Sequence, residues 1–251
     1  MRLPTGLQFT IPRWSRGGSE VYVTNCNVDW GSEELLAQYL DTSGSFIDIG
    51  ANIGYYSIYM APCVKSVYAF EPNSRVLPAL RANSLVAKNI TVIAKAVAAF
   101  DGITGFQQER DSEVSHVIEG GDGERGVCLV PAVTIDSFVR DQKIEVTGIK
   151  IDAEGADFAI ITGMKETMIT QQPLVLSEVG ASRELFSFLN SINYECFGFV
   201  MGSVSERASF AKIAELGFAT KMLFLVPPRL QSEFAKLAAA REVPRGLAKR
   251  G

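Results

Sequence analysis

The sequence predicts an α/β fold built on an open, mostly parallel sheet, and two observations carry this prediction. First, a short apolar run at 45–49 leads directly into a glycine-rich turn, Gly50-Ala-Asn-Ile-Gly54, and then into a helical pattern. Second, another apolar run at 66–70 ends on an acid, Glu71. The order strand, glycine turn, helix, strand and acid is how an open α/β sheet builds a nucleoside pocket.

The periodicity of apolar residues then assigns the elements in chain order. Residues 1–44 are expected to form an extension, with a small hairpin of 7–11 and 20–24 and a helix capped within 29–33. The predicted strands of the sheet are 45–49, 66–70, 90–98, 148–152, 173–178, 194–200 and 222–226. The predicted helices are 55–61, 76–87, 134–140, 154–163, 182–189, 205–216 and a last one around 230–238.

Two departures from simple alternation complete the predicted architecture. Turn signals such as Asp101-Gly102 and Gly120-Gly121 interrupt residues 99–132, which predicts β-hairpins beside the main sheet. The last two strands have no full crossover between them, so we expect the order 3-2-1-4-5-7-6 with strand 7 antiparallel. The main domain is therefore expected at 45–228, followed by a C-terminal helix and a basic tail at 229–251.

Composition limits the classes of function. The chain has 251 residues, 47% of them hydrophobic, and a formal net charge of −4, which gives no support to nucleic-acid binding. The cysteines are scattered without a C-x-x-C spacing, so we expect reduced thiols rather than a zinc site or a disulfide frame. No signal peptide and no membrane-length apolar run is visible, and the working expectation is a soluble cytoplasmic protein.

The glycine turn also bears on which nucleoside the pocket takes. The dinucleotide fingerprint G-x-G-x-x-G lacks one glycine here, and Asp48 stands at the carboxyl end of the preceding strand. A carboxylate there would repel a pyrophosphate and attract a cation. S-adenosylmethionine is cationic and has no phosphate, and Glu71 lies about where an acid accepts hydrogen bonds from a ribose. The alternative for Asp48 is a helix N-cap.

Four segments together resemble the FkbM family of S-adenosylmethionine-dependent methyltransferases, which have the class I fold. These segments are Phe46-Ile-Asp-Ile-Gly-Ala-Asn-Ile-Gly-Tyr-Tyr-Ser57, Tyr68-Ala-Phe-Glu-Pro-Asn73, Thr134-Ile-Asp-Ser-Phe138 and Ile149-Lys-Ile-Asp-Ala-Glu-Gly-Ala-Asp157. The resemblance covers about residues 30–200. The first segment alone is typical of any class I methyltransferase, and the segment Lys150–Gly155 narrows the choice.

The resemblance implies a set of cofactor-binding residues. Those expected at the methionine end and backbone of S-adenosylmethionine are Asp48, Gly50, Ala51, Asn52 and Gly54. Those expected around the adenosine are Glu71 at the ribose, Pro72 and Asn73 beside it, and Ala96 and Val97 for at most a backbone contact. It also implies a small-molecule, natural-product or saccharide acceptor that is methylated on a hydroxyl group.

Methyl transfer to a hydroxyl is an in-line displacement that benefits from positioning and from a general base. Asp152, at the tip of the fourth strand, is the expected base, and Glu154 is expected to assist or to bind substrate. The alternative is that both acids favour the dipole of the following helix. His116, in the irregular region, is expected to be a surface or packing residue. Oxygen atoms of Asp152, Glu154 and Glu178 suit a divalent cation, but no spacing requires one and we expect no metal.

Two other classes of function compete with this interpretation. One is a nicotinamide-dependent oxidoreductase, which the missing glycine and Asp48 oppose. The other is a non-catalytic binding module with a methyltransferase fold, which the intact set of Asp48, Gly50, Gly54 and Glu71 opposes. The expected partner is thus a small acceptor molecule, with no nucleic acid and no membrane span.

Overall fold

A computed structural model describes residues 1–107, 116–118, 127–201 and 209–240 of the chain. The strands of its main sheet are β1 (Ser45–Ile49), β2 (Ser66–Phe70), β3 (Ile90–Ile93), β8 (Val146–Ile151), β9 (Leu174–Ser177), β10 (Glu195–Val200), β11 (Ser209–Lys212) and β12 (Thr220–Val226). The α-helices are α1 (Arg16–Val23), α2 (Ser32–Gln38), α3 (Tyr55–Met60), α4 (Leu77–Ser84), α5 (Ile135–Gln142), α6 (Asp157–Gly163), α7 (Lys165–Gln171), α8 (Arg183–Ser191) and α9 (Gln231–Ala240).

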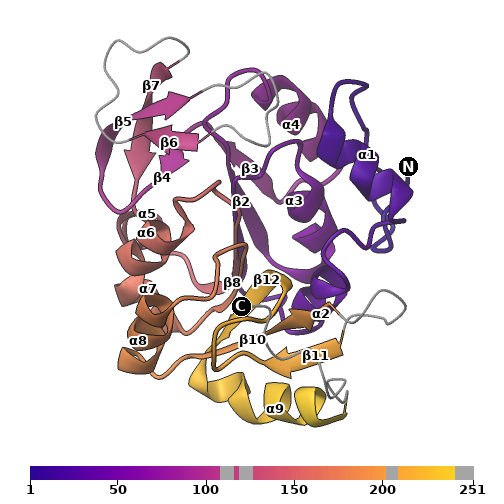
Figure 1. Ribbon diagram of the computed structural model, residues 1–251. Coiled ribbons are helices and arrows are strands. Elements are labelled where there is room, and N and C mark those ends of the chain that lie inside the picture. Colours follow the sequence, from indigo (N-terminus) through magenta and orange to yellow (C-terminus); the bar gives the residue numbers. More distant parts are fainter. Residues whose placement is uncertain (108–115, 119–126, 202–208, 241–251) are drawn as a thin grey trace.

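The main sheet has the order β11-β10-β12-β9-β8-β1-β2-β3. Leaving out β11, this is the predicted order 3-2-1-4-5-7-6, and β12 is antiparallel to both of its neighbours as expected. Helices α1 to α4 lie on one face of the sheet and α5 to α8 on the other (Figure 1). The predicted α/β fold class is confirmed.

One edge of the sheet differs from the prediction. A helix was expected at 205–216, but residues 209–212 form strand β11, which pairs antiparallel with β10; residues 202–208 lie outside the described part of the chain. The buried ring of Phe210 stacks on Phe197 at 6.0 Å and also contacts Phe224 and Phe234. The aromatic cluster and the open edge of β10 therefore favour a strand over a helix here.

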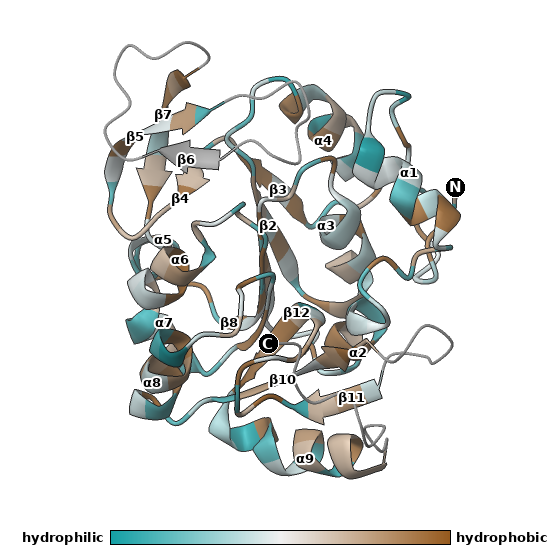
Figure 2. Cartoon of the chain, viewed as in Figure 1, coloured by the Kyte–Doolittle hydropathy of each residue, from teal (hydrophilic) through white to brown (hydrophobic). Residues whose placement is uncertain are grey.

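The hydrophobic core consists of two layers, one on each face of the sheet. Successive side chains of β1 show this, because Phe46 belongs to the layer under α2 and α3, whereas Ile47 and Ile49 belong to the layer under α5 to α8. Figure 2 shows hydrophobic residues along the strands between the two helix layers. Asp48 points to the same side as Phe46, and this sets the geometry of the site described below.

The predicted N-terminal hairpin is wrong. Residues 16–23 form α1, whose first turn is capped by Ser15 accepting a hydrogen bond from the Gly18 N–H at 3.0 Å. Gly18 and Val21 give the helix a buried face at a spacing of three residues. A Cβ at Gly18 would lie 2.6 Å from Ile11, so glycine permits this close packing. The amphipathic pattern and the N-cap therefore favour a helix here, although the β-branched residues within 20–24 favour a strand.

The helix expected after residues 29–33 is present as α2, but its start differs in detail. Its N-cap is Gly31, with φ of 98° and no side-chain capping bond. Instead, the Glu33 carboxylate accepts the backbone N–H of Asp29 at 3.0 Å. The side chain of Asp29 is thereby left to contact the core of the site.

The β-hairpin insertion is confirmed as a second sheet with the order β4-β7-β5-β6. Its strands are β4 (Ala96–Val97), β5 (Gly102–Gln107), β6 (His116–Ile118) and β7 (Val127–Val133). The strand predicted at 90–98 is split, because the main-sheet strand β3 ends at Ile93 and Ala96–Val97 pairs with β7. The last helix is confirmed as α9, while the basic tail at 241–251 lies outside the described residues.

Within the described ranges, no helix combines the length and the apolar character needed to cross a membrane.

Replacing Leu36 in α2 by Ala tests whether the N-terminal extension unfolds together with the sheet. Leu36 is fully buried in the same core layer as Phe46, so Leu36→Ala should lower the free energy of unfolding by about 2–5 kcal/mol. Urea denaturation measures this. Leu85→Ala, at a residue that is 85% exposed, is the control and should cost less than about 0.5 kcal/mol. A Leu36→Ala effect as small as the control's would mean that α2 is not part of the cooperative core.

Candidate active site

The site begins at the turn between β1 and α3. Gly50 and Gly54 have φ of 70° and 93°, in the left-handed region that favours glycine. A Cβ at Gly50 would lie 1.9 Å from the carbonyl oxygen of Asp152. Glycine at position 50 therefore lets the end of β1 approach the end of β8, and these two strands flank the point where the strand order reverses.

Directly under this turn, Asp48 and Lys150 form a buried ion pair. They are register partners on β1 and β8, and Lys150 Nζ lies 3.7 Å from Asp48 Oδ1. The Asp48 side chain is fully buried, and its Oδ2 accepts a hydrogen bond of 2.6 Å from Ser57. Asp48 does not cap α3, because the N-cap residue is Gly54. Asp48 thus lies beneath the site, with its charge paired.

Sequence reasoning did not predict Lys150 as a site residue, yet it lies at the centre of these contacts and lines the cavity described below. Its ammonium donates to the carbonyl oxygen of Gly50 at 3.0 Å, lies 3.2 Å from Asp152 Oδ2 and lies 5.5 Å from the centre of the Tyr56 ring. Burial alone would lower the pKa of Lys150, but Asp152 and Asp48 outweigh burial and raise it above its ordinary value. The sequence feature that could have identified Lys150 is a charged residue within the otherwise apolar strand segment Gly148–Ile151.

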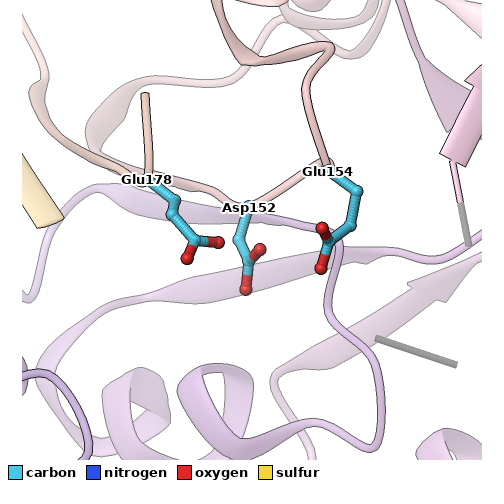
Figure 3. A group of neighbouring side chains, drawn as sticks. All are labelled: Asp152, Glu154 and Glu178. Atoms are coloured by element: carbon cyan, nitrogen blue, oxygen red, sulfur yellow. The ribbon is translucent and has the colours of Figure 1, made fainter. Parts of the chain in front are cut away.

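The structure brings Asp152, Glu154 and Glu178 together, as Figure 3 shows; one carboxylate oxygen from each lies within 4.8 Å of the others. Neither Asp152 nor Glu154 is the N-cap of α6, which begins at Asp157 after Ala156. Burial would raise the pKa of Asp152, but Lys150 holds it below its usual range. Burial and the neighbouring Asp152 raise the pKa of Glu178 to about 8. Carboxylate oxygens this close together suit a cation, and the ammonium group of Lys150 is already such a cation beside Asp152.

Glu71 anchors the glycine turn to the end of β2. Its two carboxylate oxygens accept the backbone N–H groups of Asn52 and Asn73, each at 2.8 Å. The residue is only 6% exposed. Burial raises the pKa of Glu71 to about 7, against the opposing effect of these two hydrogen bonds. Glu71 therefore holds the turn in shape, whatever else it contacts.

A cavity of about 200 Å³ opens beside the turn. The predicted site residues that line this cavity are Gly50, Ala51, Asn52, Asp152 and Glu154. Its lining also includes Lys150 and Glu178. The expected residues that do not line it are Asp48, Gly54, Glu71, Pro72, Asn73, Ala96 and Val97. Ala96 and Val97 are buried in β4 of the second sheet rather than at the end of a main-sheet strand.

The N-terminal extension supplies the opposite wall of this cavity, which the sequence did not predict. Tyr56 donates a hydrogen bond of 2.6 Å to Asp29. Lys221, from the start of β12, donates to Glu20 at 2.9 Å and to the Val28 carbonyl at 3.0 Å, and its Nζ lies 3.4 Å from Asp29. A continuous set of polar contacts thus runs from Asp152 through Lys150 and Tyr56 to α1.

The sequence of residues 48–200 matches the family described as "Methyltransferase FkbM domain". Among solved structures, the chain is similar to a methyltransferase FkbM from Methylobacillus flagellatus KT, with 17% identity, a TM-score of 0.47 and coverage of 74% of this chain and 44% of that one. It is also similar to an rRNA methylase from Streptococcus thermophilus (13% identity, TM-score 0.43, coverage 78% and 93%). A third is TrmK of M. capricolum with S-adenosylhomocysteine (14% identity, TM-score 0.42, coverage 78% and 68%). No curated protein matches the chain.

Acids with raised pKa values predict how stability depends on pH. The pKa values of Glu33 and Glu71 are raised to about 7, and that of Glu178 to about 8, from an ordinary value of 4.5. The folded protein therefore binds more protons than the unfolded chain between these values, and its free energy of unfolding falls as pH rises through this window. Thermal unfolding should show a midpoint that falls from about pH 5 to about pH 8.5.

Glu33→Gln is the companion variant for this measurement, because it removes one of the titrating groups while leaving the other two. It should flatten part of the decline. A midpoint that rises with pH over the same interval would contradict the assignment of raised pKa values to these carboxyls.

Proposed function

Because the chain belongs to the FkbM methyltransferase family, whose sequence pattern it matches over residues 48–200, we propose that it transfers a methyl group from S-adenosylmethionine to a hydroxyl group of a small molecule, natural product or saccharide. The observation that carries the cofactor assignment is the hydrogen bonding of the glycine turn. The observation that carries the reaction is the Asp152 carboxylate, held ionised beside that turn.

The turn has few donors to offer a phosphate. The N–H groups of Gly50 and Ala51 donate to the carbonyl oxygen of Phe70 at 3.1 and 2.9 Å, and that of Asn52 donates to Glu71. A pyrophosphate needs such N–H groups at the turn to bind. This argues against a nicotinamide cofactor more strongly than Asp48 does, because the charge of Asp48 is paired with Lys150 beneath the surface.

The residues of the turn fit the cationic methionine end of S-adenosylmethionine. The side-chain oxygen of Asn52 is buried on the cavity wall and has no hydrogen-bond partner in the described structure. An unpaired buried acceptor calls for a donor such as an ammonium group. We assign Gly50, Ala51 and Asn52 to direct contact with the cofactor, with Asp48 and Gly54 holding the turn in place.

For the adenosine half, Glu71 remains the proposed ribose acceptor. Each of its carboxylate oxygens accepts one backbone N–H and keeps a second lone pair for a hydroxyl group. Pro72 and Asn73 follow it in the chain, and Ala96 and Val97 remain proposed as backbone contacts only. These assignments put the ribose at the end of β2 and the methionine end at the end of β1.

S-adenosylmethionine supplies a methyl group on a sulfonium, which is a good leaving group, so the protein's contribution is to position the acceptor oxygen and to remove its proton. With the methyl donor bound, Asp152 would hold the acceptor hydroxyl group at the cavity wall and would take up its proton. Lys150 keeps Asp152 ionised and fixes its orientation. Because the pKa of Asp152 is low, Asp152 is a weak base that acts mainly late, as the hydroxyl becomes acidic in the transition state. Glu154 lies at the same wall and is proposed to orient the acceptor.

A non-catalytic binding module is the second candidate. The three-way contact of Lys150 with Asp152, Asp48 and the Gly50 carbonyl favours an enzyme. Burying a lysine between two acids is costly, and binding alone has no use for an ionised carboxylate held at the cavity wall.

Glu71→Gln tests the cofactor site. The amide has one acceptor oxygen in place of two and turns its N–H group toward a backbone donor, so the turn should loosen. We expect S-adenosylhomocysteine to bind roughly tenfold to a hundredfold more weakly, measured by calorimetry. The matched control is Glu145→Gln, an exposed residue next to the opposite end of β8. Unchanged affinity in Glu71→Gln would remove Glu71 from the site.

Asp152→Asn tests the reaction. The substitution keeps the shape and the hydrogen bond to Lys150 but removes the base, so turnover should fall about a hundredfold or more. Affinity for S-adenosylhomocysteine should stay within about threefold. The rate is measured by transfer of radiolabel to an acceptor found by screening small hydroxylated compounds. Equal losses in turnover and in affinity would instead make Asp152 a cofactor ligand.

A further inference from the structure

The ammonium group of Lys150 lies between two acids, and its polar contacts alone do not fix it at either one. It donates to the carbonyl oxygen of Gly50 at 3.0 Å and lies 3.2 Å from Asp152 Oδ2. Asp48 Oδ1 lies 3.7 Å away, beyond hydrogen-bonding distance, and has no hydrogen-bond partner among the described residues. The ammonium group therefore has a second acid toward which it can shift, away from Asp152.

The ring of Tyr56 supplies a further contact to this ammonium group. Lys150 Nζ lies over the ring, 5.5 Å from its centre, which is within the distance at which an aromatic face attracts a cation. Tyr56 is buried in α3, the helix that follows the glycine turn. The ring both attracts the ammonium group and keeps water from it, and the attraction is stronger for a cation without its water.

The hydroxyl group of Tyr56 holds the ring from its other end. It donates a hydrogen bond of 2.6 Å to Asp29 Oδ2, and Asp29 is buried. The second oxygen, Asp29 Oδ1, lies 3.4 Å from Nζ of Lys221. Burial and the nearby Asp29 raise the pKa of the Tyr56 hydroxyl group well above its ordinary value, so it stays a neutral donor. The position of the ring is consequently set by a residue of the N-terminal extension.

Two other buried tyrosines of α3 serve for comparison. The hydroxyl group of Tyr55 lies 3.0 Å from the carbonyl oxygen of Cys26 and 3.2 Å from Glu33. The ring of Tyr59 packs against that of Tyr55, with 6.0 Å between their centres, and Tyr59 does not line the cavity. Within the described part of the chain, the aromatic contact of Lys150 is with Tyr56. Burial in α3 is thus shared by these tyrosines, whereas the contact with Lys150 distinguishes Tyr56.

We infer that Tyr56 is a positioning residue of the proposed reaction: its ring holds the Lys150 ammonium group at Asp152, and its hydroxyl group ties this arrangement to Asp29. The inference rests on the proposed methyltransferase function, in which Asp152 takes up the proton of the acceptor. Without the ring, water would reach the ammonium group, and Asp48 would compete with Asp152 for it. Asp152 would then lose part of the charge that keeps it ionised and in place, although Tyr56 takes no part in the proton transfer itself.

Exchange of the Lys150 ammonium hydrogens with water measures this role without any acceptor. The full chain is labelled with nitrogen-15 lysine, and the exchange rates of the ammonium groups are measured by NMR at about pH 6. Among the described lysines only Lys150 and Lys221 are not exposed, so a slow signal that persists in Lys221→Arg belongs to Lys150. We expect Lys150 to exchange at least about tenfold more slowly than the exposed lysines. Exchange as fast as theirs would overturn the inference.

Tyr56→Leu removes the ring and should speed this exchange about tenfold. Tyr56→Phe keeps the ring and loses only the bond to Asp29, so it should have a smaller effect, about twofold to fivefold. Tyr59→Leu is the matched control, because Tyr59 lies on the same helix and is 4% exposed against 6% for Tyr56. It should leave the exchange of Lys150 within about twofold. Equal exchange rates in Tyr56→Leu and Tyr59→Leu would give Tyr56 a merely structural role.

A milder pair of variants decides the question if Tyr56→Leu does not fold. Faster exchange of Lys150 in Tyr56→Phe than in Tyr59→Phe is the expected result, and equal rates would overturn the inference. Tyr56→Phe should also lower kcat about threefold to tenfold on an acceptor found by radiolabel screening, with affinity for S-adenosylhomocysteine within about twofold. Failure of S-adenosylhomocysteine to bind the unsubstituted protein would instead refute the proposed function.

Discussion

The ion pair between Asp48 and Lys150 is the constraint on which the rest of the site depends. It lies between β1 and β8, where the strand order reverses and where open α/β sheets bind their ligands. Two opposite charges buried in a core are costly unless each stays paired and hydrogen-bonded. Here Ser57 donates to one carboxylate oxygen of Asp48 and the other oxygen faces Lys150 at 3.7 Å without a hydrogen bond, while the Gly50 carbonyl and Asp152 are further partners of Lys150. The pair consequently fixes the turn above it and the acid beside it in one arrangement.

This pairing changes the electrostatic reason for a cationic cofactor. From the sequence, Asp48 is a bare carboxylate facing the nucleoside. In the structure its charge is paired with Lys150, and the proposed preference for a cofactor without phosphate rests instead on turn N–H groups that donate to Phe70 and Glu71. The ionised carboxylate on the cavity wall is that of Asp152, further along the sheet, whose pKa Lys150 holds below its usual range.

The local part of this architecture could be read from the sequence. Strands β1 and β2 occur at the predicted residues, and the glycine turn and the order of the seven strands follow from apolar periodicity, turn chemistry and short connections, all of which act between near neighbours. The misassigned segments have conflicting local signals. The segment 20–24 contains the β-branched residues Val21, Val23 and Thr24, yet it forms the end of a capped helix. Residues 209–212 join the sheet because Phe210 packs on Phe197 and the strand pairs with the open edge of β10.

The sequence by itself determined the fold class, the turn and the identity of the acids at the strand ends, because a strand and the turn after it are specified by consecutive residues. Only the tertiary structure decided what those acids do. Lys150 reaches Gly50 across 100 positions of sequence, and Lys221 reaches Val28 across 193. Burial and pairing at such separations set which carboxylates are neutralised beneath the surface and which face the cavity, and no local pattern encodes that choice.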